Sequence, residues 1–265
     1  MGSVLLRQHQ DHRDTLMSGS STRDEGEHWH GRQHQLLPFT VSLVSTENDL
    51  LEAIALRAAA YSRHKAPAAD KLHVAEEDDR RDDVAVLVAR SKLDDGVLGT
   101  IRINPNFNAP MRFEASASLP LSFAGRRCAE FMRLGVTSGD GGRLVTKALA
   151  KASYEICVAA QIDYIFVASR PPVDLVYRAY MFDDLLNGSK VELQYAPGIP
   201  HSILCLPVAE AEQRWLEHSR PVHRFFVETA HPDIKIDNAA VARQFAAASE
   251  GFWEGDPKAP RVAAR

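Results

Sequence analysis

Two hydrophobic periods alternate along this 265-residue chain and predict a mixed α/β fold. Apolar residues at helical spacing, such as Leu50, Ile54 and Ala58, indicate helices, whereas short apolar or alternating runs indicate strands. The predicted strands are Pro38–Ser45, Val84–Ala89, Val97–Ile103, Glu130–Val136, Asp163–Ala168, Val191–Tyr195 and Ser202–Leu206. The predicted helices are Glu47–Arg63, Arg143–Ala160, Val173–Tyr180, Glu210–His218, Val222–Thr229 and Asn238–Glu250.

Local signals fix several of these boundaries. Thr46, with Asp49 three residues later, has the spacing of a capping box at the start of the first helix. Asp94, Asp95 and Gly96 supply a turn, so the two strands beside them form a hairpin. Because hairpins alternate with helical crossovers, the order of elements predicts a partly antiparallel sheet flanked by helices.

The polar stretches divide the chain. We expect a disordered polar arm at residues 1–36, one α/β domain at 37–208, a helical extension packed on it at 209–254, and a tail at 255–265. The arm carries His28, His30 and His34, but no cysteine or second cluster completes a metal coordination set. A solvated tail without a metal is therefore favoured.

Composition narrows the class of protein. The apolar fraction of 45% and charged fraction of 25% are ordinary for a globular protein, and a net charge of −4 argues against nucleic-acid binding. Cys128, Cys157 and Cys205 lie far apart in apolar runs, which favours reduced thiols. No apolar run approaches the roughly 20 residues of a membrane span, and no signal peptide is visible. We therefore expect a cytoplasmic protein.

The candidate chemistry centres on Ala129–Arg143, where a strand, a glycine-rich loop and a helix follow one another. Such a junction offers backbone N–H groups to a phosphate, and the residues that would offer them are Ser138, Gly139, Gly141, Gly142 and Arg143. Glu130 and Arg133 lie just upstream, within reach of a group held by that loop. They form either a site or a structural ion pair bracing the strand.

The order of elements around this loop resembles the GNAT N-acyltransferase fold, and Asp174–Phe182 resembles its late helix, where Tyr177 matches a tyrosine that often faces the thioester sulfur. A narrower resemblance is to the acyl-homoserine lactone synthases and the related N-acyl amino acid synthases of the FeeM type. It covers residues 40–206. The residues that carry it, in order, are Arg57, Asp79, Asp82, Arg102, Glu130 and Arg133.

The resemblance implies an enzyme that transfers a fatty acyl group from an acyl-carrier-protein or CoA thioester to an amino acid, giving a long-chain N-acyl amino acid. No tightly bound cofactor is implied, because the acyl-phosphopantetheine thioester is a co-substrate. Lactone synthases carry a Trp after the first helix's arginine, where this chain has Tyr61, and this chain adds an arm and C-terminal helices. A homoserine lactone synthase is the alternative enzyme, and a non-catalytic acyl-ligand or partner-binding module is the alternative outside the enzymes.

On this interpretation Glu130 is the base, Arg133 pairs with it or binds the acceptor carboxylate, and Tyr177 is the acid for the leaving thiol or a core aromatic. Arg57, Asp79, Asp82 and Arg102 contact substrate or form a buried salt-bridge network, and the two roles are compatible. Phe107, Met111 and Phe113 line an acyl groove or belong to the core. An acidic carrier protein would require a local basic patch, for which the candidates are Arg126, Arg127, Arg143, Lys147 and Lys151.

Overall fold

The computed structural model describes residues 33–63, 72–139 and 141–253, with side chains described up to residue 248. Most of the predicted arm, with His28 and His30, and the tail at 255–265 lie outside these residues. The strands are β1 (Gln33–His34), β2 (Phe39–Leu43), β3 (Ala85–Ser91), β4 (Val97–Pro105), β5 (Cys128–Val136), β6 (Tyr164–Ser169), β7 (Asp183–Asp184), β8 (Val191–Leu193), β9 (Ala196–Pro207) and β10 (Thr229–Ala230). The helices are α1 (Glu47–Ser62), α2 (Gly142–Ala159), α3 (Val173–Ala179), α4 (Val208–His218), α5 (Arg220–His223) and α6 (Asn238–Trp253).

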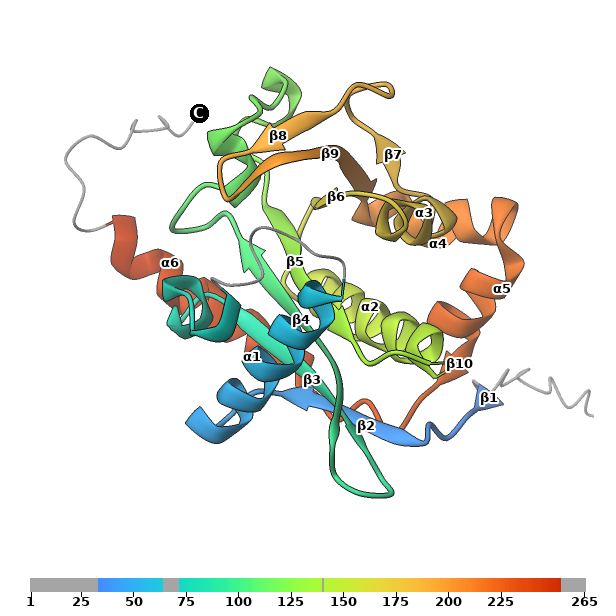
Figure 1. Cartoon of the computed structure of the whole chain (residues 1–265). Helices are drawn as coiled ribbons and strands as arrows, with labels where there is room; N and C mark the ends of the chain where they lie inside the picture. The colour runs from blue at the N-terminus through green and yellow to red at the C-terminus, as the bar shows by residue number, and fades with distance from the viewer. Residues whose placement is uncertain (1–32, 64–71, 140, 254–265) are drawn as a thin grey trace, which may run out of the picture. The chain divides into compact units, whose positions relative to one another are not determined.

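The central sheet has the order β2-β3-β4-β5-β6-β9-β7, and β8 pairs with β9 (Figure 1). Every pairing along this order is antiparallel except β5–β6, which is parallel and extends only from Cys128–Tyr164 to Glu130–Phe166. The predicted mixed, mostly antiparallel sheet is therefore confirmed. Beyond Glu130 the two central strands separate, which opens the middle of the sheet.

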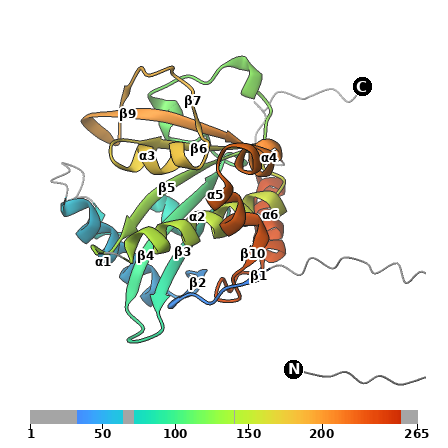
Figure 2. The ribbon, with the colours of Figure 1, turned by 90° about the vertical axis from the view of Figure 1, so that its right-hand side faces the viewer.

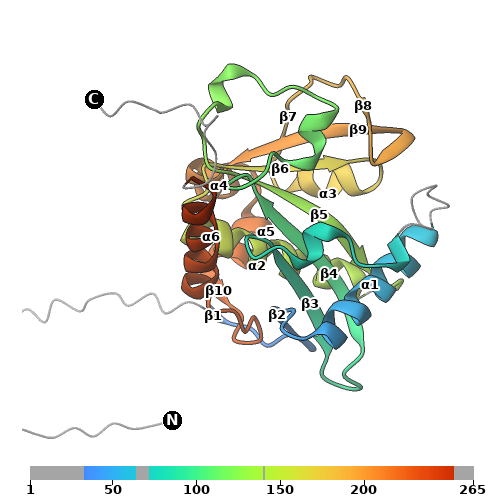
Figure 3. The ribbon, with the colours of Figure 1, turned by 90° about the vertical axis from the view of Figure 1, so that its left-hand side faces the viewer.

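Helices α1 and α2 cover opposite faces of the sheet, α2 in front in Figure 2 and α1 in front in Figure 3. The predicted capping box starts α1, since Asp49 N–H donates to Thr46 Oγ1 (3.1 Å) and Thr46 N–H donates to Asp49 Oδ2 (3.2 Å). The main apolar core lies between the sheet and α2 and continues onto α4 and α6. None of the described helices is long and apolar enough to cross a membrane.

Some predicted boundaries were wrong. β1 lies inside the segment predicted as a disordered arm and pairs with β10 in a separate two-stranded sheet. The helix predicted at Val222–Thr229 is the short α5 followed by one π-helical segment, Arg224–Glu228. The long irregular segment before β5 contains two 3-10 turns, Arg112–Ala115 and Leu121–Phe123. The first of these turns contacts Glu130 of the candidate site through the backbone N–H of Arg112.

The close approach of α2 to the sheet depends on Gly99 of β4. A Cβ atom at this position would lie 2.5 Å from Val145 Cγ1 and 3.0 Å from Leu149 Cδ1. We expect Gly99→Ala to lower the free energy of unfolding in urea by about 1–3 kcal/mol, because the packed core cannot absorb the extra methyl without shifting α2. Gly96→Ala is the matched control, since its Cβ would meet only the Asp94 carboxylate, at 3.5 Å. An equal loss in both variants would contradict this account.

Candidate active site

A β-bulge in β5 places Glu130 and Arg133 on the same side of the sheet. Met132 pairs with Arg102 of β4, whereas Gly135 pairs with Thr100, so two residues of β5 face one of β4. Arg133 lies in the bulge with φ of 56°, a left-handed conformation that costs a non-glycine residue about 1–3 kcal/mol. In a regular strand, residues three apart would face opposite sides, so this backbone turn brings the two side chains together.

Glu130 is completely buried, and each of its oxygens has a different neighbour. Oε2 accepts the backbone N–H of Arg112 at 2.7 Å, and Oε1 lies 3.4 Å from the hydroxyl of Tyr195. Burial raises the pKa of Glu130 to about 7, although the N–H groups of Arg112 and Phe113 and the guanidiniums of Arg102 and Arg133 oppose the shift. A carboxylate that titrates near neutrality is suited to accept a proton.

Arg133 does not pair with Glu130, which corrects one of the two predicted roles. Its Nε and one terminal nitrogen donate to the two oxygens of Glu76, at 2.7 and 2.6 Å. This bidentate pair lowers the pKa of Glu76 against the opposing effect of burial, and holds the Arg133 guanidinium 5.5 Å from the centre of the Tyr195 ring. Arg133 therefore forms a structural ion pair as predicted, but with Glu76 and not with Glu130.

Asp79 is the centre of a second buried set of ion pairs. Arg57 donates to both of its oxygens, at 2.9 and 2.8 Å, and Arg102 donates to Oδ1 at 2.8 Å. The backbone N–H of Glu76 donates to Oδ2 at 2.8 Å. Although burial opposes it, Arg57 and Arg102 hold the pKa of Asp79 far below its usual range. The structure thus brings together Arg57, Asp79 and Arg102, as predicted.

Asp82 does not belong to this network, which corrects its predicted place. Asp82 is exposed, and the carboxylate that joins Asp79 in the network is that of Asp78. Asp78 Oδ2 lies 2.9 Å from Arg112 and 3.3 Å from Arg102, and Arg81 also pairs with it. Both Glu76 and Asp78 were missed, because a run of six acids in one segment gives no sign of which carboxylates turn inward.

The network holds more positive than negative charge. Five guanidinium groups, those of Arg57, Arg81, Arg102, Arg112 and Arg133, share the four carboxylates of Glu76, Asp78, Asp79 and Asp83. Arg112 is the most exposed of the five, since 34% of its side chain is accessible. The arrangement can accommodate one further anionic group at its exposed side.

The glycine loop leads into the start of α2. Gly139 has φ of 116°, which favours glycine, and a Cβ atom on Gly142 would lie 3.0 Å from the carbonyl oxygen of Thr137. Gly141 is the N-cap of α2 and supplies no side-chain cap, and the N–H groups of Gly142 and Leu144 already donate to Gly139 O (3.2 Å) and Gly141 O (3.1 Å). Arg143 is exposed beside it. Ser138, Gly139, Gly141, Gly142 and Arg143 therefore lie where a helix N-terminus meets a loop, as predicted, and their role in binding stays a prediction.

Two buried serines lie side by side on paired strands where β6 has separated from β5. Ser169 of β6 pairs with Ser202 of β9, and the two residues are 5% and 1% exposed. Neither hydroxyl has a hydrogen-bond partner among the described residues. Buried polar groups are seldom left without partners, so these two hydroxyls are candidates for contact with a polar ligand.

Tyr177 lies on the other face of β5 from Glu130. It is 3% exposed, and its ring packs against Tyr180 and Phe182 with centroid distances of 6.4 and 5.3 Å. It lines an apolar cavity of about 10 Å³ together with Phe131, Trp215 and others, which is room for about one water molecule. Tyr177 is thus a core aromatic in this structure, and its role as an acid stays a prediction.

The three residues predicted to line an acyl groove do not lie together. Met111 and Phe113 belong to a second apolar cluster on the Glu130 side, whereas Phe107 packs edge-on against Phe245.

The basic candidates do not form one patch, because the nine residues of β5, about 30 Å, separate Arg126 and Arg127 from Arg143. Lys151 is buried and bonds to Phe225 O, Thr229 O and His231, and Lys147 bonds to Pro221 O. Arg143 is the exposed candidate beside the glycine loop.

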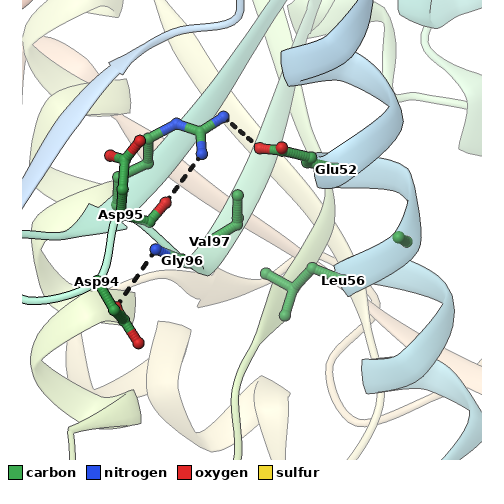
Figure 4. A pocket seen from close by; sticks show the side chains of 8 residues that line it. Glu52, Leu56, Asp94, Asp95, Gly96 and Val97 are labelled. Carbon is green, nitrogen blue, oxygen red and sulfur yellow. Dashed lines mark hydrogen bonds and ion pairs between the residues drawn. The ribbon is translucent and has the colours of Figure 1, made fainter.

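A surface depression lies elsewhere, between α1 and the β3–β4 hairpin (Figure 4). Arg90 lines it and donates to Glu52 Oε2 and to the carbonyl oxygen of Asp95. None of the predicted site residues lines this depression. The described residues contain no cluster of three or more His, Cys, Asp or Glu that could hold a metal ion.

Known proteins share this fold. The family model of the N-acyl amino acid synthase FeeM matches residues 52–197. The solved structure of FeeM from uncultured soil microbes has 14% sequence identity and a TM-score of 0.55, and the match covers 66% of this chain and 93% of that chain. The CoA-dependent acyl-homoserine lactone synthase BjaI, solved with MTA, has 15% identity and a TM-score of 0.52, covering 77% and 99%. No curated protein sequence matches this chain. The predicted GNAT-like fold and family resemblance are confirmed.

Proposed function

This chain belongs to the family of the N-acyl amino acid synthase FeeM and is an N-acyltransferase, and we propose that it transfers a fatty acyl group from an acyl-carrier-protein thioester to the amine of an amino acid. The observation that carries the proposal is the position of Glu130. This buried carboxylate lies at the residue where the β5–β6 pairing ends, so a base stands beside the opening of the sheet.

The donor would enter through that opening. The start of α2 and the glycine loop offer N–H groups for the phosphate of phosphopantetheine. The hydroxyls of Ser169 and Ser202, which have no hydrogen-bond partner in the described part of the chain, would bind the amides of its arm. Arg143 is exposed at the end of this loop and Arg63 bonds to Val136 O at its start, and one phosphate needs less positive charge than the three of CoA. This favours the carrier protein over CoA as donor.

The acceptor would lie on the Glu130 side of β5. The excess guanidinium charge, with Arg112 partly exposed, supports binding of an acceptor carboxylate, because a planar guanidinium binds carboxylates with two hydrogen bonds. Glu130 would take a proton from the acceptor amine. The backbone of β5 beyond Glu130, unpaired with β6, would offer N–H groups to the oxyanion formed at the thioester carbonyl.

We expect incubation with fatty-acyl carrier protein and a mixture of amino acids to give an acyl-amide mass in mass spectrometry. With the same chain length, the carrier-protein thioester should give a higher kcat/KM than the CoA thioester, by about tenfold, because the glycine loop carries little charge for the nucleotide phosphates. Arg143→Ala should weaken the use of both donors.

Three other outcomes would each correct a different part of the proposal. Equal or better use of the CoA thioester would reverse the choice of donor. Consumption of S-adenosylmethionine with release of methylthioadenosine would identify a homoserine lactone synthase instead. Absence of amide with every donor, from protein shown to be folded by circular dichroism, would refute the proposed reaction.

A further inference from the structure

Tyr195 lies between the buried base and the partly exposed side of the site. It occupies the turn between β8 and β9, and its side chain is half-buried, whereas Glu130 is 0% exposed. Its hydroxyl is 3.4 Å from Glu130 Oε1. Glu130 Oε2 accepts the backbone N–H of Arg112, whereas Oε1 is the oxygen that Tyr195 faces and that would receive a proton from it.

The turn that carries Tyr195 is fixed to the segment that holds Glu130. The backbone N–H of Gln194 donates to Ser116 Oγ at 2.9 Å, and its side-chain amide donates to Ala115 O at 2.8 Å. The same segment, residues 112–116, supplies the N–H that binds Glu130. Tyr195 and Glu130 are therefore positioned by one set of contacts, which keeps the phenol aligned with the carboxylate.

Two guanidinium groups flank the phenol. Arg112 and Arg133 each lie 5.5 Å from the centre of the Tyr195 ring. Burial and the nearby Glu130 raise the pKa of Tyr195, and Arg133 and Arg112 lower it. The phenol therefore stays protonated at rest, and the guanidiniums stabilise negative charge that develops on its oxygen during proton transfer.

Resting on the proposed function, we propose that Tyr195 is a catalytic residue that relays the proton of the acceptor amine to Glu130. The amine nitrogen bonds to the acyl carbon, and the carbon–sulfur bond breaks with its electron pair left on sulfur. As the nitrogen loses its proton to the Tyr195 oxygen, the Tyr195 proton moves to Glu130 Oε1. Glu130 then returns a proton to the thiolate, so every proton is accounted for.

Tyr195→Phe tests the relay, with Tyr164→Phe as the matched control. Tyr164 belongs to the same apolar cluster, where its ring packs 4.8 Å from that of Phe123. We expect Tyr195→Phe to lower kcat about 100-fold with little change in the acceptor KM, and Tyr164→Phe to keep kcat within about twofold. The rate in mixtures of H₂O and D₂O should indicate two protons in flight for the wild type and one for Tyr195→Phe.

A second measurement does not depend on turnover. The groups that face Glu130 are Arg102 of β4, Arg133 of β5, the Arg112 segment and Tyr195, with Tyr61 of α1 within electrostatic range of Tyr195. Carbon-13 NMR of the Glu130 carboxyl should show a higher pKa in Tyr195→Phe, because the ionised carboxylate loses a hydrogen-bond donor. Unchanged kcat and an unchanged carboxyl titration would overturn the relay alone. A wild type that forms no amide would overturn the proposed function, and the relay with it.

Discussion

Glu130→Gln is expected to lower kcat about 10²–10⁴-fold, the usual contribution of a positioned general base. The wild-type rate should rise with pH through about 7, where the buried carboxyl ionises. The variant should lose this rise, because its amide does not titrate. A pH–rate profile of both proteins at saturating donor measures the effect. Glu114→Gln makes the same exchange in the neighbouring 3-10 turn, where Glu114 bonds to Met111 N, and should leave kcat within about twofold.

Stability measurements separate a catalytic role for Glu130 from a structural one. Its pKa of about 7 is above the ordinary 4.5, so the folded state binds the proton more tightly than the unfolded state. The contribution of Glu130 to stability is therefore greatest below pH 4.5 and is lost as pH rises through 7. At pH 8 Glu130→Gln should unfold no more easily than the wild type, and gain at most about 3 kcal/mol. A variant that loses both activity and stability would instead indicate a structural carboxylate.

The elements of the fold were predictable because each has a strong local pattern. The capping box at Thr46, the hairpin turn at residues 94–96 and the apolar stripe of α2 are confirmed. Tertiary contacts decided the rest. The sequence pattern places Lys151 on the polar side of an amphipathic helix. In the structure the C-terminal segment covers this lysine, and the carbonyl groups of Phe225 and Thr229 accept its hydrogen bonds. No local sequence pattern indicates that a second segment will bury the polar side of a helix.

The candidate site was predictable only where spacing along regular elements was sufficient. Arg57 and Arg102 lie on a helix and a strand, and both meet Asp79 as the resemblance implied. The bulge at Arg133 has no sequence signal, since it places a bulky residue in a conformation that usually favours glycine. Tyr195 reaches Glu130 from 65 residues away and from a turn, so neither periodicity nor spacing relates the two.

Asp79→Asn is expected to lower the free energy of unfolding by about 3–5 kcal/mol, because it leaves the buried guanidinium of Arg57 without a carboxylate. All the hydrogen-bonding positions of Asp79 are used, by Arg57, Arg102 and the N–H of Glu76, so the amide nitrogen of asparagine would also face a donor. Urea unfolding at pH 7 measures the loss. Asp82→Asn makes the same exchange three residues later at an exposed position, and should change stability by no more than about 0.5 kcal/mol.

The difference between Asp79→Asn and the wild type should also depend on pH. Because the folded-state pKa of Asp79 is depressed, its contribution is present above the unfolded-state value of about 4 and is lost as pH falls through the folded-state pKa. Urea midpoints of the two proteins should therefore converge in strong acid, separate as pH rises toward about 4, and keep a constant difference above it. A constant difference at all pH values would mean that the aspartate acts through packing and not through its charge. If Asp79→Asn were as stable as Asp82→Asn at pH 7, the network would not be needed for folding.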